Sequence, residues 1–140
     1  ADHGQNWTKR NGVTSANLSD AIMLGAKIWV VGDSDIVLIS EDNGESWQIT
    51  HASTGEDLKA LGFAPGQSNI GWVAGRNGAL AWTNNGGATW QLVSNIAGSD
   101  KTGCDLFAVA AGSASVAWAG GSVLTSNDGD WGGLVSPQSW

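Results

Sequence analysis

The sequence predicts an all-β protein built from a repeated unit, and three observations support this prediction. A short polar turn that ends in tryptophan occurs four times at intervals of about 40 residues, at residues 2–7, 42–47, 85–90 and 127–131. An apolar run with its own tryptophan precedes each of the last three turns, and the 140 residues include 21 glycines. Repeats of this length made of short strands are typical of propeller blades, which bury their apolar faces against one another.

Each of the four turns has the chemistry of a tight connection between two strands. Its Asp or Asn side chain accepts hydrogen bonds from main-chain N–H groups a few residues later, and its glycine tolerates the positive φ that the reversal requires. The tryptophan ring folds back to cover the turn. We interpret these residues as a structural motif, which comprises Asp2, Gly4, Trp7, Asp42, Gly44, Trp47, Asn85, Gly87, Trp90, Asn127, Gly129 and Trp131.

Three strand-like runs precede the turn in each unit, and the strand after the turn completes a predicted blade of four strands. The first runs open with Asn17, Asp57 and Asp105; the second runs contain Trp29, Trp72 and Trp118; the third runs cover 36–40, 79–83 and 122–125. We treat the chain as one repeat domain, 1–140, with an N-terminal strand at 1–10, repeat units at approximately 11–47, 48–90 and 91–131, and a C-terminal tail at 132–140.

The turn resembles a known repeat. The pattern [Ser/Thr]-x-[Asp/Asn]-x-Gly-x-[Ser/Thr]-Trp is matched in full from Ser40 to Trp47, and again from Thr83 to Trp90 with Asn85 in place of Asp. It is similar to the Asp-box, or BNR-type, repeat of sialidases and of photosystem II assembly factors, which are β-propellers. The order of the runs ahead of the turn also resembles the assembly factors across nearly the whole chain. The resemblance implies a β-propeller fold.

The same resemblance argues against catalysis. Sialidases with this repeat use three arginines to hold the substrate and a tyrosine as nucleophile, whereas this chain has only Arg10 and Arg76 and no tyrosine. Its 13 acidic residues contain no pair that the sequence singles out for glycoside hydrolysis. His3, His51 and Cys104 do not have the spacing of a metal site or a catalytic triad. We predict no enzyme activity, no catalytic residues, no metal and no cofactor.

The charge of the chain excludes several classes of partner. Six Lys and Arg against 13 Asp and Glu give a net charge of −7. Such a protein repels the phosphates of nucleic acids and anionic lipid surfaces. No apolar run approaches the roughly 20 residues that cross a bilayer. We therefore expect neither nucleic acid nor a membrane as partner.

The number of predicted blades is too small for a closed ring. Closed propellers use about four to eight blades, and three blades leave two apolar flanks open. We therefore expect a homo-oligomer, most simply a dimer that forms a ring of six blades, in which the strand at 1–10 completes a blade of the neighbouring subunit. The alternatives are an open stack within a larger assembly and a segment of a longer protein.

Candidate binding residues lie in the loops that join blades and in the loops between second and third strands, which share one face in propellers. The first runs of the second and third units are further apart in sequence than those of the first and second units, which indicates an insertion at 95–104. The candidates for this face are Asp33, Asp35, His51, Arg76, Asn77 and Lys101. Eight of the nine tryptophans are explained as packing residues of the repeat. Trp140 has no equivalent and is a candidate anchor between subunits, with an exposed tail or a sugar platform as alternatives.

Three functions fit these patterns. The preferred one is a non-catalytic structural or interaction protein whose blades assemble into an oligomeric ring or a larger particle, such as a virion or an extracellular assembly, which is also the favoured location. The second is a carbohydrate-binding propeller lectin. The third is a glycosidase-like remnant. A lectin built from repeats favours polar residues that recur once per unit, and here only those of the turn recur.

Overall fold

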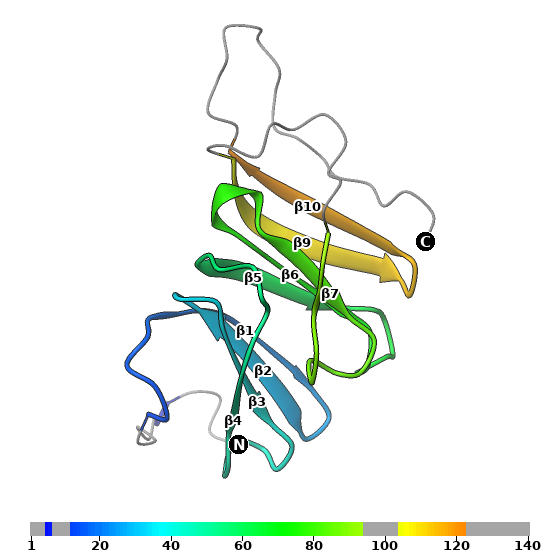
Figure 1. The fold of residues 1–140 in the computed structure, drawn as a ribbon. Coiled ribbons are helices and arrows are strands. Elements are labelled where there is room, and N and C mark those ends of the chain that lie inside the picture. Colours follow the sequence, from blue (N-terminus) through cyan, green and yellow to red (C-terminus); the bar gives the residue numbers. More distant parts are fainter. Residues whose placement is uncertain (1–4, 7–11, 94–103, 123–140) are drawn as a thin grey trace, which may run out of the picture.

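The computed structural model describes residues 5–6, 12–93 and 104–122, which form three antiparallel sheets (Figure 1). Sheet 1 contains β1 (Leu18–Leu24), β2 (Lys27–Gly32), β3 (Ile36–Ser40) and β4 (Gln48–His51). Sheet 2 contains β5 (Leu58–Phe63), β6 (Gly71–Gly75), β7 (Leu80–Thr83) and β8 (Gln91–Leu92), with the 3₁₀ turn η1 (Arg76–Gly78) between β6 and β7. Sheet 3 is described for β9 (Asp105–Ser113) and β10 (Val116–Ser122).

The order of the strands confirms the predicted fold class. In sheets 1 and 2 each strand pairs with the next one along the chain, so each sheet is a meander of four strands. The polar turns of the second and third motif copies connect β3 to β4 and β7 to β8, as the pattern predicts. The predicted run at 122–125 and the fourth motif copy fall mostly beyond the described residues, as does most of the predicted N-terminal strand at 1–10.

The main core lies between sheets 1 and 2. Because successive side chains of a strand point to opposite faces, Trp29 and Val31 of β2 lie on the same face of sheet 1. They pack with Leu61 and Phe63 of β5 and with Val73 of β6. The rings of Trp29 and Phe63 lie 4.1 Å apart between centroids. Full burial of such side chains contributes about 1.5–3 kcal/mol each.

The opposite face of sheet 2 packs against sheet 3. Ala74 and Leu80 form a buried cluster with Leu106 of β9 and Ala119 of β10. A second cluster joins Trp72 to Ala117. Sheet 2 is therefore covered on both faces, and all five residues of β6 are buried. Figure 1 shows the three sheets in a row, with the first strands β1, β5 and β9 next to one another.

A glycine contact recurs in all three sheets and shows that they are copies of one unit. A Cβ atom on Gly32 or on Gly75 would lie 2.1 Å from the main-chain oxygen of Asn17 or Asp57. On Gly121 it would lie 1.8 Å from that of Asp105. Each contact lies beside an irregularity in the pairing of the first two strands. Only glycine lets the second strand pass this close to the start of the first strand.

Candidate interaction surfaces

The turn between β3 and β4, which we call box 1 (residues 40–47), is held by hydrogen bonds among its own side chains. The hydroxyl of Ser40 donates to Asp42 Oδ1 at 2.9 Å and accepts from the N–H of Gly44 at 2.8 Å. The N–H of Ser46 donates to Asp42 Oδ1 at 2.8 Å, and the Ser46 hydroxyl donates to Asp42 Oδ2. The Trp47 indole N–H donates to the oxygen of Gly44 at 3.1 Å. The polar residues of box 1 therefore satisfy one another.

These hydrogen bonds stabilise the charged form of Asp42. The hydroxyl and the N–H of Ser46, followed by the hydroxyl of Ser40, lower the pKa of Asp42 to about 2. A carboxylate that accepts several hydrogen bonds binds a proton less readily, which is the physical cause of this shift. Asp42 is therefore ionised in the folded protein under all but strongly acidic conditions.

The turn between β7 and β8, box 2 (residues 83–90), has the same arrangement with an amide in place of the carboxylate. The hydroxyl of Thr83 donates to Asn85 Oδ1 at 2.9 Å and accepts from the N–H of Gly87 at 3.0 Å. The N–H of Thr89 donates to Asn85 Oδ1 at 3.0 Å, and Asn85 Nδ2 donates to the Thr89 hydroxyl at 2.7 Å. The two boxes thus share these bonds, but the indole N–H of Trp90 is buried without a hydrogen-bond partner among the described residues, whereas that of Trp47 donates to Gly44.

Box 2 also forms part of the contact between sheets 1 and 2. The indole N–H of Trp29, on β2, donates to the main-chain oxygen of Gly86 at 2.8 Å. The space around Gly87 is filled by Ile39, Trp29 and Trp90. Lys27 reaches the same turn: if Gly86 carried a Cβ atom, that atom would lie 2.9 Å from Lys27 Nζ. Sheet 1 therefore docks against the main chain of the turn in sheet 2.

The tryptophans of the repeat differ in burial from sheet to sheet. Trp29, Trp72 and Trp90 are buried, as expected for packing residues. Trp47 in box 1 is only partly buried, and Trp118, the third copy of the β2 position, is 42% exposed. The expectation that Trp118 is a core residue therefore does not hold, because no further sheet among the described residues covers sheet 3. The remaining motif tryptophans, Trp7 and Trp131, and the candidate anchor Trp140 lie outside the described residues.

The predicted loop face is held together by polar contacts between sheets. Lys59 Nζ, on β5, lies 2.8 Å from Asp33 Oδ1 in the turn after β2, and Asn17 Nδ2 donates to Asp33 Oδ2 at 2.8 Å. These two contacts, with that of Lys59 first, lower the pKa of Asp33. The N–H of Ser34 donates to Asp57 Oδ1 at 3.0 Å. Loop residues of sheet 1 are therefore bound to the start of sheet 2.

The other candidates for the binding face also contact protein groups. Asp35 is buried and accepts from the N–H of Thr54 at 3.1 Å and from the Thr54 hydroxyl. Arg76 Nε lies 3.7 Å from Asp57 Oδ2. The side chain of Asn77 donates to Glu56 at 2.9 Å, and its main-chain N–H donates to Asp105 Oδ1 at 3.1 Å. Lys101 lies outside the described residues.

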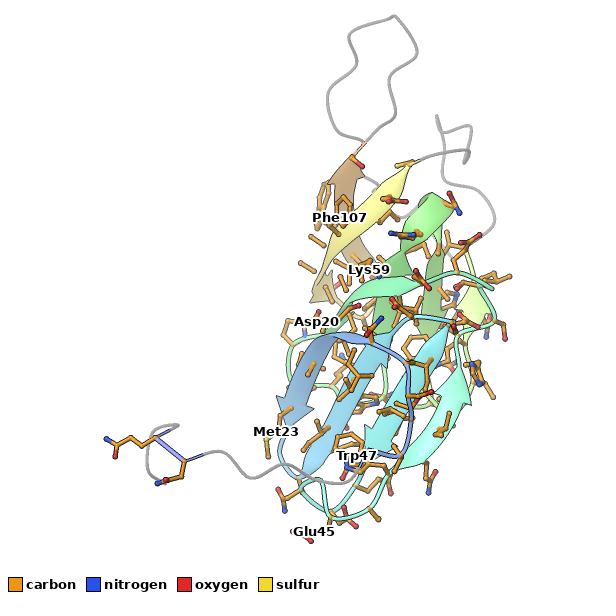
Figure 2. All side chains as sticks on the ribbon, turned by 90° about the vertical axis from the view of Figure 1, so that its left-hand side faces the viewer. Asp20, Met23, Glu45, Trp47, Lys59 and Phe107 are labelled. Atoms are coloured by element: carbon orange, nitrogen blue, oxygen red, sulfur yellow. The ribbon has the colours of Figure 1, made fainter. Side chains whose placement is uncertain are left out.

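Sequence reasoning did not assign a role to Asp57 and Asp105 at this face. Asp57 directly precedes β5 and Asp105 is the first residue of β9, and each accepts a hydrogen bond from the loop of the preceding sheet, at Ser34 or at Asn77. Asp57 and Asp105 hold equivalent positions in the repeat, and this equivalence could have indicated their shared role. Lys59 has no such signal, because the corresponding positions carry Ser19 and Phe107. Figure 2 shows Lys59 and Phe107 on the same side of the molecule, along the first strands.

One hollow opens beside this face. It has a volume of about 470 Å³ and is lined by Thr14, Ser15, Ala16, Asn17, Asp33, Ser34, Ile36 and His51. His51 is the only predicted candidate besides Asp33 that lines it. Among the described residues, no cluster of three His, Cys, Asp or Glu has the arrangement of a metal site. None of the helical structure in the described ranges is long and apolar enough to cross a bilayer.

Large apolar residues are exposed on both terminal sheets, sheet 1 and sheet 3. Leu18 and Met23 of β1 are 50% and 55% exposed. Leu58 and Phe63, which hold the same positions in β5, are 0% and 7% exposed. On sheet 3, Phe107 is 56% exposed in addition to Trp118. The two exposed regions belong to opposite ends of the row of sheets, as Figure 2 shows for Met23 and Phe107.

Comparisons with known proteins identify the fold. No family model matches the chain, and no curated protein matches it. Among solved structures, YCF48 bound to D1 peptide is similar with a TM-score of 0.62 and 22% identity, over 76% of this chain and 35% of that one. YCF48 from Cyanidioschyzon merolae is similar with a TM-score of 0.63 and 21% identity, over 78% of this chain and 35% of that one. The chain thus spans about a third of the length of these structures, and its sheets form part of a β-propeller.

Proposed function

We propose that this chain is a non-catalytic interaction protein whose sheets complete a propeller together with further protein subunits. The unequal burial of equivalent positions carries the proposal. Leu58 and Phe63 are covered by sheet 1, whereas Leu18 and Met23 are half exposed. Ile36 and Leu38 of sheet 1 are already buried, so the exposed apolar side chains of this sheet are Leu18 and Met23 on β1 and Ile49 on β4, which is 49% exposed. Exposed apolar surface of this kind is typical of protein contacts.

A second copy of the chain is the partner that fits most simply. Two copies give six sheets, which lies within the roughly four to eight blades of closed propellers. Closed symmetry also leaves no flank unpaired. Other subunits of a larger particle, such as a virion or an extracellular assembly, are the alternative partner. The similarity to a YCF48 structure that contains a D1 peptide supports a protein as partner.

The contacts of the acidic side chains support a non-catalytic role. Asp33, Asp35 and Asp42 each bind groups of the chain itself, in a loop contact, a buried turn and box 1 respectively. A general acid or base needs a shifted pKa near the working pH together with access to substrate. The pKa shifts of Asp33 and Asp42 are downward, which keeps both groups ionised.

The mass of the protein in solution tests the proposal. Light scattering during size exclusion, at micromolar concentration, is expected to give about twice the 14.3 kDa mass of one chain. Dilution is expected to shift the equilibrium toward the single chain. A mass of one chain at every concentration, up to the solubility limit, contradicts self-association.

Carbohydrate binding is the second candidate, and the polar hollow beside β1 favours it. The hollow offers Asp33 and His51 as hydrogen-bonding groups for hydroxyls. In the second unit the position of Asp33 carries Arg76 and that of His51 carries Ser94, so the polar set does not recur. A glycan array separates the two candidates. We expect no specific binding, and a ligand whose binding is lost in His51→Ala would support the lectin.

A further inference from the structure

Two other tryptophans, Trp29 and Trp72, hold the same position in the repeat as the exposed Trp118. Each of Trp29, Trp72 and Trp118 lies three residues before the glycine that crosses the start of the first strand. Trp29 is fully buried, contacts Phe63, and donates its indole N–H to Gly86 in box 2. Trp118 presents the same indole on the outer side of sheet 3, where it is 42% exposed.

We propose that Trp118 docks onto sheet 1 of a second copy of this chain, as Trp29 docks onto sheet 2 within one copy. In this contact the indole N–H of Trp118 donates to the main-chain oxygen of Asn43 in the second copy, and its ring packs on Met23. The inference rests on the proposed function, because it names the surface through which self-association takes place.

Asn43 is the equivalent of Gly86, which accepts the hydrogen bond from Trp29. Both precede the glycine of their box, and both have positive φ, 58° for Asn43 and 72° for Gly86. The N–H of Asn43 donates to Ala26 at 3.0 Å, and the N–H of Gly86 donates to Asn69 at 2.9 Å. The two carbonyl groups therefore have equivalent settings. Gly86 is buried against sheet 1, whereas Asn43 is exposed.

The side chains around the two carbonyl groups favour a second copy as the occupant. Lys27 lies so close to Gly86 that a Cβ atom there would be 2.9 Å from its Nζ. Lys27 precedes Trp29 by two residues, and Val116 holds the same position before Trp118. Val116 is shorter, lacks the charge and is 38% exposed. The outer side of sheet 3 therefore has room for the Asn43 side chain, which sheet 1 does not offer at Gly86.

The aromatic contact has a matching replacement. Phe63 packs against Trp29 within one copy, and Met23 holds the position of Phe63 in sheet 1. Met23 is 55% exposed. Methionine makes favourable contacts with aromatic rings through its sulfur and adapts to irregular surfaces. Met23, Glu45 and Trp47 gather at the end of sheet 1 that is remote from Phe107 on sheet 3 (Figure 2). Sheets 1 and 3 are the two ends of the row of sheets, so a contact between Met23 of one copy and Trp118 of another is a head-to-tail contact.

Two charge substitutions test the contact by light scattering. Trp118→Glu and Met23→Lys are each expected to give the mass of a single chain at the concentration where the unmodified protein is dimeric. Leu92→Lys is the matched control, because Leu92 is 54% exposed on the middle sheet, away from both surfaces. It is expected to leave the dimer intact. Circular dichroism checks that each variant keeps its β structure.

A mixture of the two variants tests the direction of the contact. The Met23→Lys chain keeps its Trp118, and the Trp118→Glu chain keeps its Met23, so one native contact forms between them. In a ring of two, the other contact then pairs Glu with Lys. The mixture is therefore expected to recover a dimeric mass that neither variant shows alone. Monomeric variants that do not associate when mixed overturn the head-to-tail arrangement.

The outcomes separate this inference from the proposed function. If the unmodified protein is dimeric and remains so in both charge variants, the contact is wrong and self-association stands. If the unmodified protein is a single chain throughout, self-association itself fails. If Trp118→Glu does not fold, Trp118→Phe takes its place as the test. Trp118→Phe keeps an aromatic ring and removes the N–H donor. It is expected to weaken the dimer by about tenfold or less, and an unchanged dissociation constant contradicts the Asn43 hydrogen bond.

Discussion

Box 1 and box 2 share the hydrogen bonds of their first hydroxyl and of their Asp or Asn, but their surroundings are opposite. In both turns a hydroxyl at the first position binds the Asp or Asn and the glycine N–H. Sheet 1 covers Gly86 and Gly87 of box 2, whereas Asn43 of box 1 is exposed. The local structure of the turn is therefore independent of its burial. A turn of this kind is both a connection within one sheet and a surface on which the preceding sheet packs.

The largest predicted effect compares the tryptophans that face these turns. Trp29→Ala is expected to lower the free energy of unfolding by roughly 3–5 kcal/mol, because it leaves a cavity and removes the donor to Gly86. Trp118→Ala is expected to change it by no more than about 1 kcal/mol in the single chain, because its ring is partly in solvent. Urea unfolding of dilute protein measures both. Equal losses contradict the difference in docking.

Trp29→Phe serves as the milder variant where Trp29→Ala does not fold. It keeps most of the ring and leaves the buried oxygen of Gly86 without its donor. The expected loss is about 1–3 kcal/mol, the cost of an unsatisfied buried polar group. The effect is smaller than that of Trp29→Ala and remains larger than that of Trp118→Ala.

The second prediction compares the two box glycines, which have the same backbone conformation. Gly44 and Gly87 both have φ of +88°, so alanine is strained in either turn. At Gly87 a Cβ atom meets Ile39 at 3.1 Å and Trp29 and Trp90 at 3.3 Å, whereas at Gly44 its nearest neighbour is Trp47 at 3.5 Å. Gly87→Ala is therefore expected to destabilise the protein by about 1–3 kcal/mol more than Gly44→Ala. Thermal unfolding of the two variants gives the difference, and equal melting temperatures contradict it.

The sequence predicts the parts of this comparison that depend on neighbouring residues. The spacing of Ser40, Asp42 and Gly44 is sufficient for the box, because the hydrogen bonds join residues two to four positions apart. The alternating runs also predict the strands, since one face of each is apolar. The period of the repeat predicts the order of the sheets. The fold class follows from these local features.

The contacts between sheets could not be predicted in the same way. Trp29 and Gly86 are 57 positions apart, and no pattern in the sequence indicates which main-chain oxygen the indole meets. Asp33 and Asp35 are both aspartates and lie only two positions apart. One binds Lys59 at the loop face and the other is buried against Thr54. Their difference depends on the path of loops from two sheets. The sequence therefore predicts this face as a region and does not predict which groups in it are accessible.

The smallest predicted effect concerns the central side chain of the two boxes, which is Asp42 in box 1 and Asn85 in box 2. The pKa of Asp42 is about 2 in the folded protein, below the ordinary 3.8. Its contribution to stability is therefore complete above pH 3.8 and is lost as the pH falls through 2. Asp42→Asn is expected to be near neutral at pH 7, because Asn85 makes equivalent bonds to Thr89. Below pH 4 its unfolding midpoint should fall less steeply than that of the unmodified protein.

The reciprocal substitution supplies the control for that measurement. Asn85→Asp places a carboxylate within reach of the N–H and hydroxyl of Thr89. It is therefore expected to make the stability of box 2 depend on pH, as Asp42→Asn removes that dependence from box 1. Other carboxylates, such as Asp33, contribute equally to all three proteins and cancel in the comparison. Parallel curves for the three proteins between pH 2 and pH 4 would contradict the shift at Asp42. Opposite changes in slope show that the same local hydrogen bonds control ionisation in the exposed box and in the box that sheet 1 covers.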